Sequence, residues 1–170
     1  AIAHLHSRGI KGKLGAMGTS LGAAVIFLAA GTAAELAAVV GECAFATFEG
    51  MIADGMHTVY GLPSPVTRPL AWMMARVAAW WRGFPREGAD PVRAIGRISP
   101  RPVFVIHGED DRRVPVATAY ALDAAAGEPK ELWVMPGVAH TMGLERLGAE
   151  YSRRVLAFFD RWLKTDAQES

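Results

Sequence analysis

The chain has 170 residues, of which 51% are hydrophobic and 21% are charged, and this composition is typical of one soluble globular domain. Its 18 lysines and arginines against 17 acidic residues give a formal net charge of +1, which supplies no broad attraction to nucleic acid or to an anionic membrane. The apolar segment LGAAVIFLAAG is shorter than the roughly 20 residues of a membrane-spanning helix, and PLAWMMARVAAWW is interrupted by Arg76. We therefore expect neither a nucleic-acid partner nor stable membrane insertion.

The first residues, AIAHLHSRG, are more typical of the end of a helix than of a signal peptide, and no initiator methionine precedes them. We expect the true N-terminus to lie upstream, which leaves the localisation undetermined. The single cysteine, Cys43, has no second cysteine for an intrachain disulfide or a metal site. Its apolar surroundings predict a buried, inert thiol. This cysteine usage does not demand an oxidising compartment, which favours the cytoplasm.

Short apolar or β-branched runs alternate with longer runs of helical periodicity, which is the pattern of βαβ units around a parallel sheet. Strands are predicted over residues 13–17, 38–44, 102–107 and 131–135. Helices are predicted directly after Ser20 and over residues 116–125 and 147–164. The last helix has an apolar stripe that should dock on the sheet, made of Tyr151, Val155, Phe158, Phe159 and Trp162. We expect one α/β domain over residues 1–170, with a mostly parallel sheet flanked by helices.

The section over residues 48–99 interrupts this alternation and predicts a cap or lid insertion. Its proline-containing borders enclose LAWMMARVAAWW, which predicts one amphipathic helix. Helical spacing groups five of its residues, namely Trp72, Met73, Arg76, Ala79 and Trp80. This spacing fits a helix packed on its own domain, and it also fits a substrate or membrane surface. If the helix covers a pocket, its aromatic and methionine side chains favour apolar acyl groups.

The segment GTSLG raises the question whether Ser20 is a nucleophile or a turn residue. A serine between two glycines, directly after a strand and before a helix, can occupy a sharp turn that exposes its hydroxyl. We expect Gly18 and Gly22 to be required, because a side chain at either position would collide with the neighbouring strand or helix. The same turn places the backbone N–H of Leu21 where an oxyanion would form. The bare pattern fits a glycine-rich turn with a capping serine equally well.

A serine nucleophile needs a base and an orienting carboxylate, and residues of both kinds follow later strands. Asp111 lies in the loop after the third predicted strand, and His140 lies in the loop after the fourth. Either residue alone fits a turn cap or a solvated loop. Asp54 and His57 could line a pocket, although a solvated loop or a helix start explains them equally well.

Serine, then aspartate, then histidine, each after a successive strand, is an order that resembles the α/β-hydrolases. The matching segments are GTSLGAA, RPVFVIHGEDDRRVP and MPGVAH, which are most similar to the C-terminal part of prolyl oligopeptidase-like or serine aminopeptidase-like esterases. The resemblance implies a catalytic triad of Ser20, Asp111 and His140, with the N–H of Leu21 in the oxyanion hole.

Within the motif HGxxDxxVP, the resemblance assigns the triad acid to Asp111 rather than to Glu109 or Asp110, and it makes His107 structural. Asp110 is the fallback acid. Such families carry several strands before the serine, so we expect the first half of the fold to be missing, together with the second oxyanion-hole donor. Loss of one donor lowers turnover about 10²–10³-fold, which predicts feeble activity. The strand over residues 13–17 would then be an exposed sheet edge that promotes oligomerisation.

These observations predict a serine hydrolase that cleaves small carboxylic esters through an acyl-enzyme intermediate and needs no metal or other cofactor. Peptidase, thioesterase and lipase activities use the same triad and stay open as alternatives. Two further alternatives are a non-catalytic scaffold that binds a small ligand or a protein partner, and a peripheral membrane role through the tryptophan-rich helix.

Overall fold

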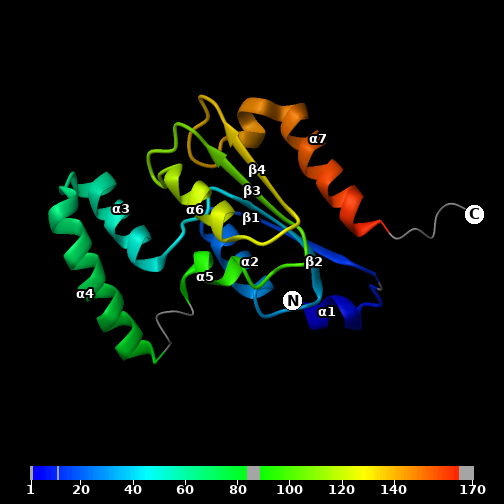
Figure 1. The fold of residues 1–170 in the computed structure, drawn as a ribbon, viewed down its shortest axis with the longest axis horizontal. Coiled ribbons are helices and arrows are strands. Elements are labelled where there is room, and N and C mark those ends of the chain that lie inside the picture. The colour runs from blue at the N-terminus through cyan, green and yellow to red at the C-terminus, as the bar shows by residue number, and fades with distance from the viewer. Residues whose placement is uncertain (1, 11, 84–88, 165–170) are drawn as a thin grey trace, which may run out of the picture.

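The computed structural model describes residues 2–10, 12–83 and 89–164, which contain a four-stranded sheet (Figure 1). In chain order and in spatial order the strands are β1 (Leu14–Thr19), β2 (Leu36–Glu42), β3 (Val103–Gly108) and β4 (Lys130–Met135). Every pairing between neighbours is parallel. The four predicted strands are confirmed, with boundaries within two residues of the prediction.

The two central strands, β2 and β3, are buried almost throughout, because helices cover both faces of the sheet. Along β1 half-buried and exposed residues alternate instead. Parallel strands need long crossover connections, and here helices supply them. As a result the carboxyl ends of all four strands lie at one edge of the sheet, where the loops after β1, β3 and β4 meet.

One face of the sheet is covered by three helices, α2 (Leu21–Ala30), α5 (Pro91–Ile95) and α6 (Ala117–Ala125) (Figure 1). They share a core in which Phe27 and Leu122 are fully buried. Helices α2 and α6 match the predicted ones closely. A short helix at the N-terminal end of the described chain, α1 (Ile2–Ser7), has no buried residue.

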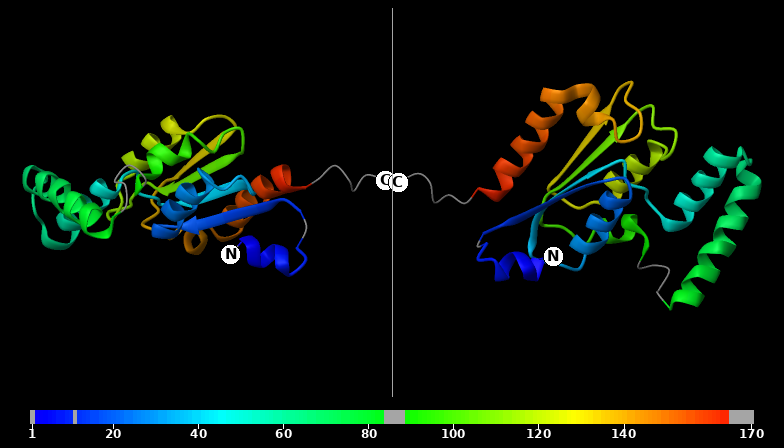
Figure 2. Two further views of the ribbon diagram at one scale, coloured as in Figure 1. Left: turned by 90° about the horizontal axis from the view of Figure 1, so that it is seen from below. Right: turned by 180° about the vertical axis from the view of Figure 1, so that it is seen from behind.

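The opposite face is covered by α7 (Gly143–Leu163), as Figures 1 and 2 show. It begins earlier than the predicted start at residue 147, because a bend at Gly148, with a φ of 44°, joins a short first segment to the long one. The predicted stripe does dock on the sheet: Tyr151, Val155 and Phe158 are buried against β2, β3 and β4. Phe159 and Trp162 are partly buried beside them.

The section between β2 and β3 folds into a helical hairpin, where the sequence predicted one helix. Its helices are α3 (Phe48–Tyr60) and α4 (Ser64–Arg82), joined by a short loop that begins at Gly61, which has a φ of 66°. Thr47 caps α3 by accepting a hydrogen bond from Gly50 N at 3.0 Å. The hairpin extends away from the sheet (Figures 1 and 2). Part of the predicted border GFPREGADP lies outside the described residues.

None of the described helices combines the length and the apolar character that crossing a bilayer requires.

Candidate active site

Ser20 lies in a strained turn between β1 and α2. Its backbone has φ 53° and ψ −122°, a conformation that costs a non-glycine residue on the order of 1–3 kcal/mol. The backbone N–H of Ser20 donates a 2.7 Å hydrogen bond to Glu42 O, at the end of β2, which holds the turn in place. The Ser20 side chain makes no capping hydrogen bond to α2, so the alternative of a helix cap does not describe it.

The two glycines beside Ser20 are not equivalent. A Cβ at Gly18 would lie 2.5 Å from the carbonyl carbon of Gly22, because β1 and the first turn of α2 touch there. A Cβ at Gly22 would meet nothing within 4 Å. The expectation that both glycines avoid a collision is therefore correct for Gly18 and wrong for Gly22.

His140 connects the serine to the carboxylate. Its Nε2 lies 2.9 Å from Ser20 Oγ, and its Nδ1 lies 2.6 Å from Asp111 Oδ2. An ionised Asp111 can only accept, so Nδ1 carries the proton and donates it, which leaves Nε2 to accept the hydrogen bond of the Ser20 hydroxyl. The three residues come from loops after β1, β3 and β4 and meet at one edge of the sheet.

Asp111 is held as a buried anion. Burial alone would raise its pKa, but hydrogen bonds from His107, from the N–H of Val114, from His140 and from the N–H of Arg113 outweigh burial and hold the pKa of Asp111 below its usual range. Both backbone N–H groups donate to Asp111 Oδ1 at 2.9 Å, so Oδ2 faces His140.

The neighbouring candidates for the acid occupy different environments. Glu109 and Asp110 are exposed, whereas Asp111 is buried and contacts His140. His107 is fully buried, and its Nε2 lies 2.9 Å from Val114 O and 3.4 Å from Asp111 Oδ2. It therefore supports the loop that carries Asp111, in agreement with the structural role that the resemblance implies.

Leu21 is the first residue of α2. The first N–H groups of an α-helix have no partner in the helix's own ladder, and they carry the positive end of the helix dipole. The N–H of Leu21 is the first of these groups in α2, and Leu21 directly follows Ser20 along the chain.

Cys43 is buried near Asp111 and His140, although the sequence predicted only an inert thiol. Burial is the main cause that raises its pKa to about 12, and its Sγ accepts a hydrogen bond from Thr141 N at 3.5 Å. Ligand atoms of Cys43, Asp111 and His140 lie within 4.8 Å of one another, a grouping that sequence spacing did not reveal. A protonated thiol and a histidine Nδ1 hydrogen-bonded to Asp111 are poor metal ligands, so this grouping does not favour a metal site.

Glu42 is a second buried residue that the sequence did not reveal. Its carboxylate accepts hydrogen bonds from the Tyr151 hydroxyl at 2.8 Å and from Gly143 N at 3.1 Å. Burial, followed by the bond to Glu42, raises the pKa of Tyr151 above its usual value. Glu42 thus joins the end of β2 to the start of α7, directly after the loop of His140. A glutamate inside an apolar strand is the signal that could have found it.

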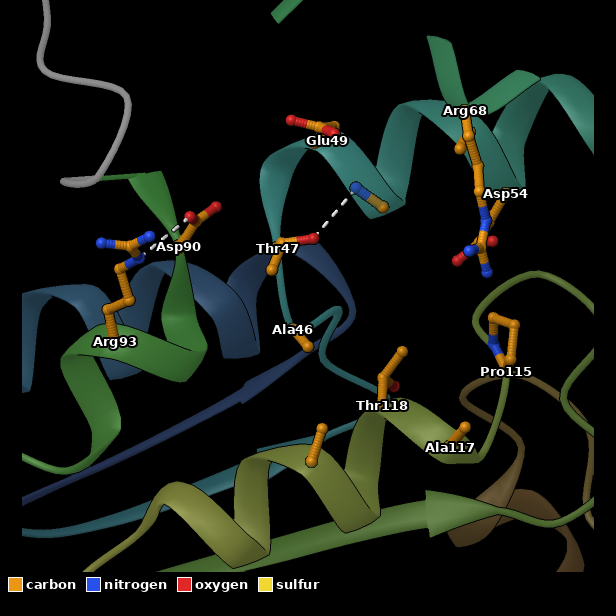
Figure 3. A pocket seen from close by; sticks show the side chains of 13 residues that line it. Ala46, Thr47, Glu49, Asp54, Arg68, Asp90, Arg93, Pro115, Ala117 and Thr118 are labelled. Atoms are coloured by element: carbon orange, nitrogen blue, oxygen red, sulfur yellow. Dashed lines mark hydrogen bonds and ion pairs between the residues drawn. The ribbon is translucent and has the colours of Figure 1, made fainter. Parts of the chain in front are cut away.

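A cavity of about 590 Å³ lies between the hairpin and the helices α5 and α6 (Figure 3). Asp54 and Arg68 line it and face one another, and burial is the main cause that raises the pKa of Asp54. His57 is exposed and lies outside the lining, with its Nδ1 2.8 Å from Leu62 O. Ser20 and His140 do not line this cavity.

Comparison with known proteins assigns the sequence to a family. The sequence matches the prolyl oligopeptidase family over residues 4–166. It is 30% identical over 152 residues to the uncharacterized protein YqkD of Bacillus subtilis, a match that covers 88% of this chain and 48% of that protein. The chain thus spans about half the length of this curated relative.

Two solved structures share the fold. An esterase of Pyrococcus furiosus superposes with a TM-score of 0.73 at 22% identity, over 96% of this chain and 59% of that one. An acylaminoacyl peptidase of Pyrococcus horikoshii superposes with a TM-score of 0.64 at 16% identity. The match covers 99% of this chain and 27% of that one. With the match over residues 4–166, the chain belongs to the prolyl oligopeptidase family, and its parallel sheet with flanking helices has the α/β-hydrolase fold in part.

Proposed function

We propose that the chain forms the catalytic part of a serine hydrolase that cleaves carboxylic esters. The observation that carries this proposal is the continuous hydrogen-bond chain from Ser20 Oγ through the His140 ring to Asp111, with separations of 2.9 and 2.6 Å. A serine hydroxyl is a weak nucleophile without a positioned base. In this proposal His140 is that base, and Asp111 fixes the tautomer of His140.

In the proposed acylation step, Ser20 Oγ attacks the ester carbonyl carbon while His140 Nε2 accepts the hydroxyl proton. The negative charge of Asp111 stabilises the imidazolium that forms. The N–H of Leu21 donates to the oxyanion of the tetrahedral intermediate. When that intermediate collapses, His140 returns the proton to the departing alkoxide, and the acyl group stays on Ser20.

Deacylation repeats these roles with water as the nucleophile. His140 Nε2 removes a proton from the water molecule, which attacks the acyl carbon, and the proton then passes to Ser20 Oγ as the acid leaves. Every proton transfer in this proposed cycle passes through His140 Nε2, so the cycle needs no further acid or base.

Hydrolysis of p-nitrophenyl butyrate by purified single variants tests this proposal. We expect Ser20→Ala and His140→Ala to remove the activity, and Asp111→Asn to lower kcat by up to about 10⁴-fold, because the amide would favour the wrong tautomer of His140. Asp110→Asn is the matched control: it makes the same change one residue away, on an exposed side chain, and should leave kcat within a few-fold of the parent. A Ser20→Ala variant as active as the parent would sink the proposal.

Amide hydrolysis is a second candidate. It is favoured by the family match, since the family is named for an oligopeptidase, and by the structural likeness to an acylaminoacyl peptidase. The triad chemistry is the same, and only the leaving group differs. An ester, a thioester and an anilide with the same acyl group, compared by kcat/KM, separate the activities. We expect the ester to be the best substrate, and a preference for the anilide would assign the chain to the peptidases.

A further inference from the structure

The outward face of α4 is apolar, the reverse of the arrangement in an ordinary surface helix. The side chains of Met73, Val77 and Trp80 are 51%, 55% and 84% exposed. Helical periodicity places Val66, also exposed, on the same side. We name these four residues, Val66, Met73, Val77 and Trp80, the α4 outer face. Apolar side chains gathered on one exposed helix face mark an interaction site more often than scattered ones do.

The opposite face of α4 is the one that packs within the hairpin. Thr67, Ala71 and Ala75 are buried at spacings of four residues. Small side chains let α4 approach α3 closely, which leaves the large apolar ones pointing outward. The hairpin extends from the sheet (Figures 1 and 2), and the exposed α4 outer face lies on the side of α4 opposite to these buried residues. Val59 and Tyr60, at the end of α3, are also exposed.

The charges on α4 distinguish between possible partners. Its sequence contains three arginines, Arg68, Arg76 and Arg82, and no aspartate or glutamate. The Arg76 guanidinium lies 4.5 Å from the centre of the Trp72 ring. Although the whole chain has a formal charge of only +1, this helix is cationic. Arg68 faces Asp54 in the cavity, so its charge is compensated within the chain. Arg76 follows Met73 by about one turn and has no acidic residue on α4 to balance it. Two copies of α4 placed face to face would bring these guanidinium groups together, whereas an anionic surface would neutralise them.

The aromatic residues point to the same partner. Three of the five tryptophans of the chain lie on α4, at positions 72, 80 and 81. Tryptophan is enriched where a protein meets the boundary between lipid headgroups and acyl chains, and arginine adds attraction to anionic headgroups. We propose that the α4 outer face binds peripherally to the surface of a membrane that contains anionic phospholipid.

This surface is connected to the candidate active site. The Thr58 hydroxyl, near the end of α3, donates a 3.1 Å hydrogen bond to Arg112 O, the residue that follows Asp111. The membrane contact itself does not depend on catalysis, so a chain without the serine nucleophile can test it.

The test is co-sedimentation of the full 170-residue chain, carrying Ser20→Ala, with vesicles of phosphatidylcholine alone or mixed with phosphatidylglycerol. We expect binding to the mixed vesicles that weakens as salt is added, and little binding to phosphatidylcholine alone. The double variant Met73→Gln/Trp80→Gln should weaken partitioning by about tenfold or more, since burial of one large apolar side chain exceeds the free energy of a tenfold change. Tyr120→Gln, which replaces an exposed aromatic residue on α6, should bind as the parent does.

Circular dichroism of each variant checks that the helices are retained. Recovery of the parent chain in the supernatant with both kinds of vesicle would overturn the proposal. Equal binding by the double variant and by Tyr120→Gln would also overturn it. A dimer detected by light scattering, and dissociated by Met73→Gln/Trp80→Gln, would assign the α4 outer face to a second copy of the chain instead of to lipid.

Discussion

Helices α4 and α7 both carry apolar side chains at helical spacing, and they use them in opposite ways. In α7, Tyr151, Val155 and Phe158 are buried against the sheet. In α4, Met73 and Trp80 are exposed, and alanines make the packed face. The stripe of α7 therefore stabilises the fold, whereas that of α4 is available for a partner. Helical periodicity reveals that a stripe exists, but the neighbours in space decide what it contacts.

Truncation of one aromatic residue in each helix should show this contrast most strongly. Phe158→Ala should lower the free energy of unfolding by about 3–5 kcal/mol, because it leaves a cavity beside Phe104, whose ring centroid is 5.3 Å away. Trp80→Ala should change it by no more than about 0.5 kcal/mol, because its side chain is 84% exposed. Urea unfolding followed by circular dichroism measures both. A large loss for Trp80→Ala would show that the α4 outer face packs within the chain.

Two glycine substitutions compare the start of α7 with helix α3 of the hairpin, with a smaller effect. A Cβ at Gly143 would lie 2.6 Å from the Tyr151 ring and 2.7 Å from Glu42 Oε1, so Gly143→Ala should cost about 1–3 kcal/mol. Gly55, inside α3, has nothing within 4 Å of its would-be Cβ, so Gly55→Ala should stabilise the chain by about 0.5–1 kcal/mol. Thermal unfolding midpoints compare the two, and a midpoint raised by Gly143→Ala would contradict the packing described at Glu42.

The candidate active site and the hairpin should also respond oppositely to acid, with the smallest effects. The pKa of Asp111 is lowered in the fold, so its contribution to stability is present above the usual aspartate pKa and is lost as pH falls below it. The pKa of Asp54 is raised, so stability gains a contribution as pH falls through its folded pKa.

Unfolding free energies measured from about pH 7 to about pH 3 check these signs. Asp111→Asn should lose less stability on acidification than the parent, and Asp54→Asn should lose more. Identical pH dependence in all three chains would show that neither carboxyl is perturbed by folding.

Much of the fold could be predicted from the sequence because the strands are short apolar runs bounded by glycine, proline or aspartate. The order of Ser20, Asp111 and His140 after the first, third and fourth strands was also visible, since parallel strands bring such loops to one edge. Glu42 was not found, because one acidic residue in a strand does not reveal its partners. The sequence predicted only one helix for the hairpin, because the break between α3 and α4 resembled an ordinary proline border.

The central claim is that Ser20 is an activated nucleophile, and reaction with a fluorophosphonate probe tests it most directly. The site of modification is identified by peptide mass spectrometry on the parent and on His140→Ala. We predict modification at Ser20 in the parent, at a rate that collapses when His140 is removed. A parent chain that is folded but unmodified, or a His140→Ala variant that reacts as fast as the parent, would contradict it.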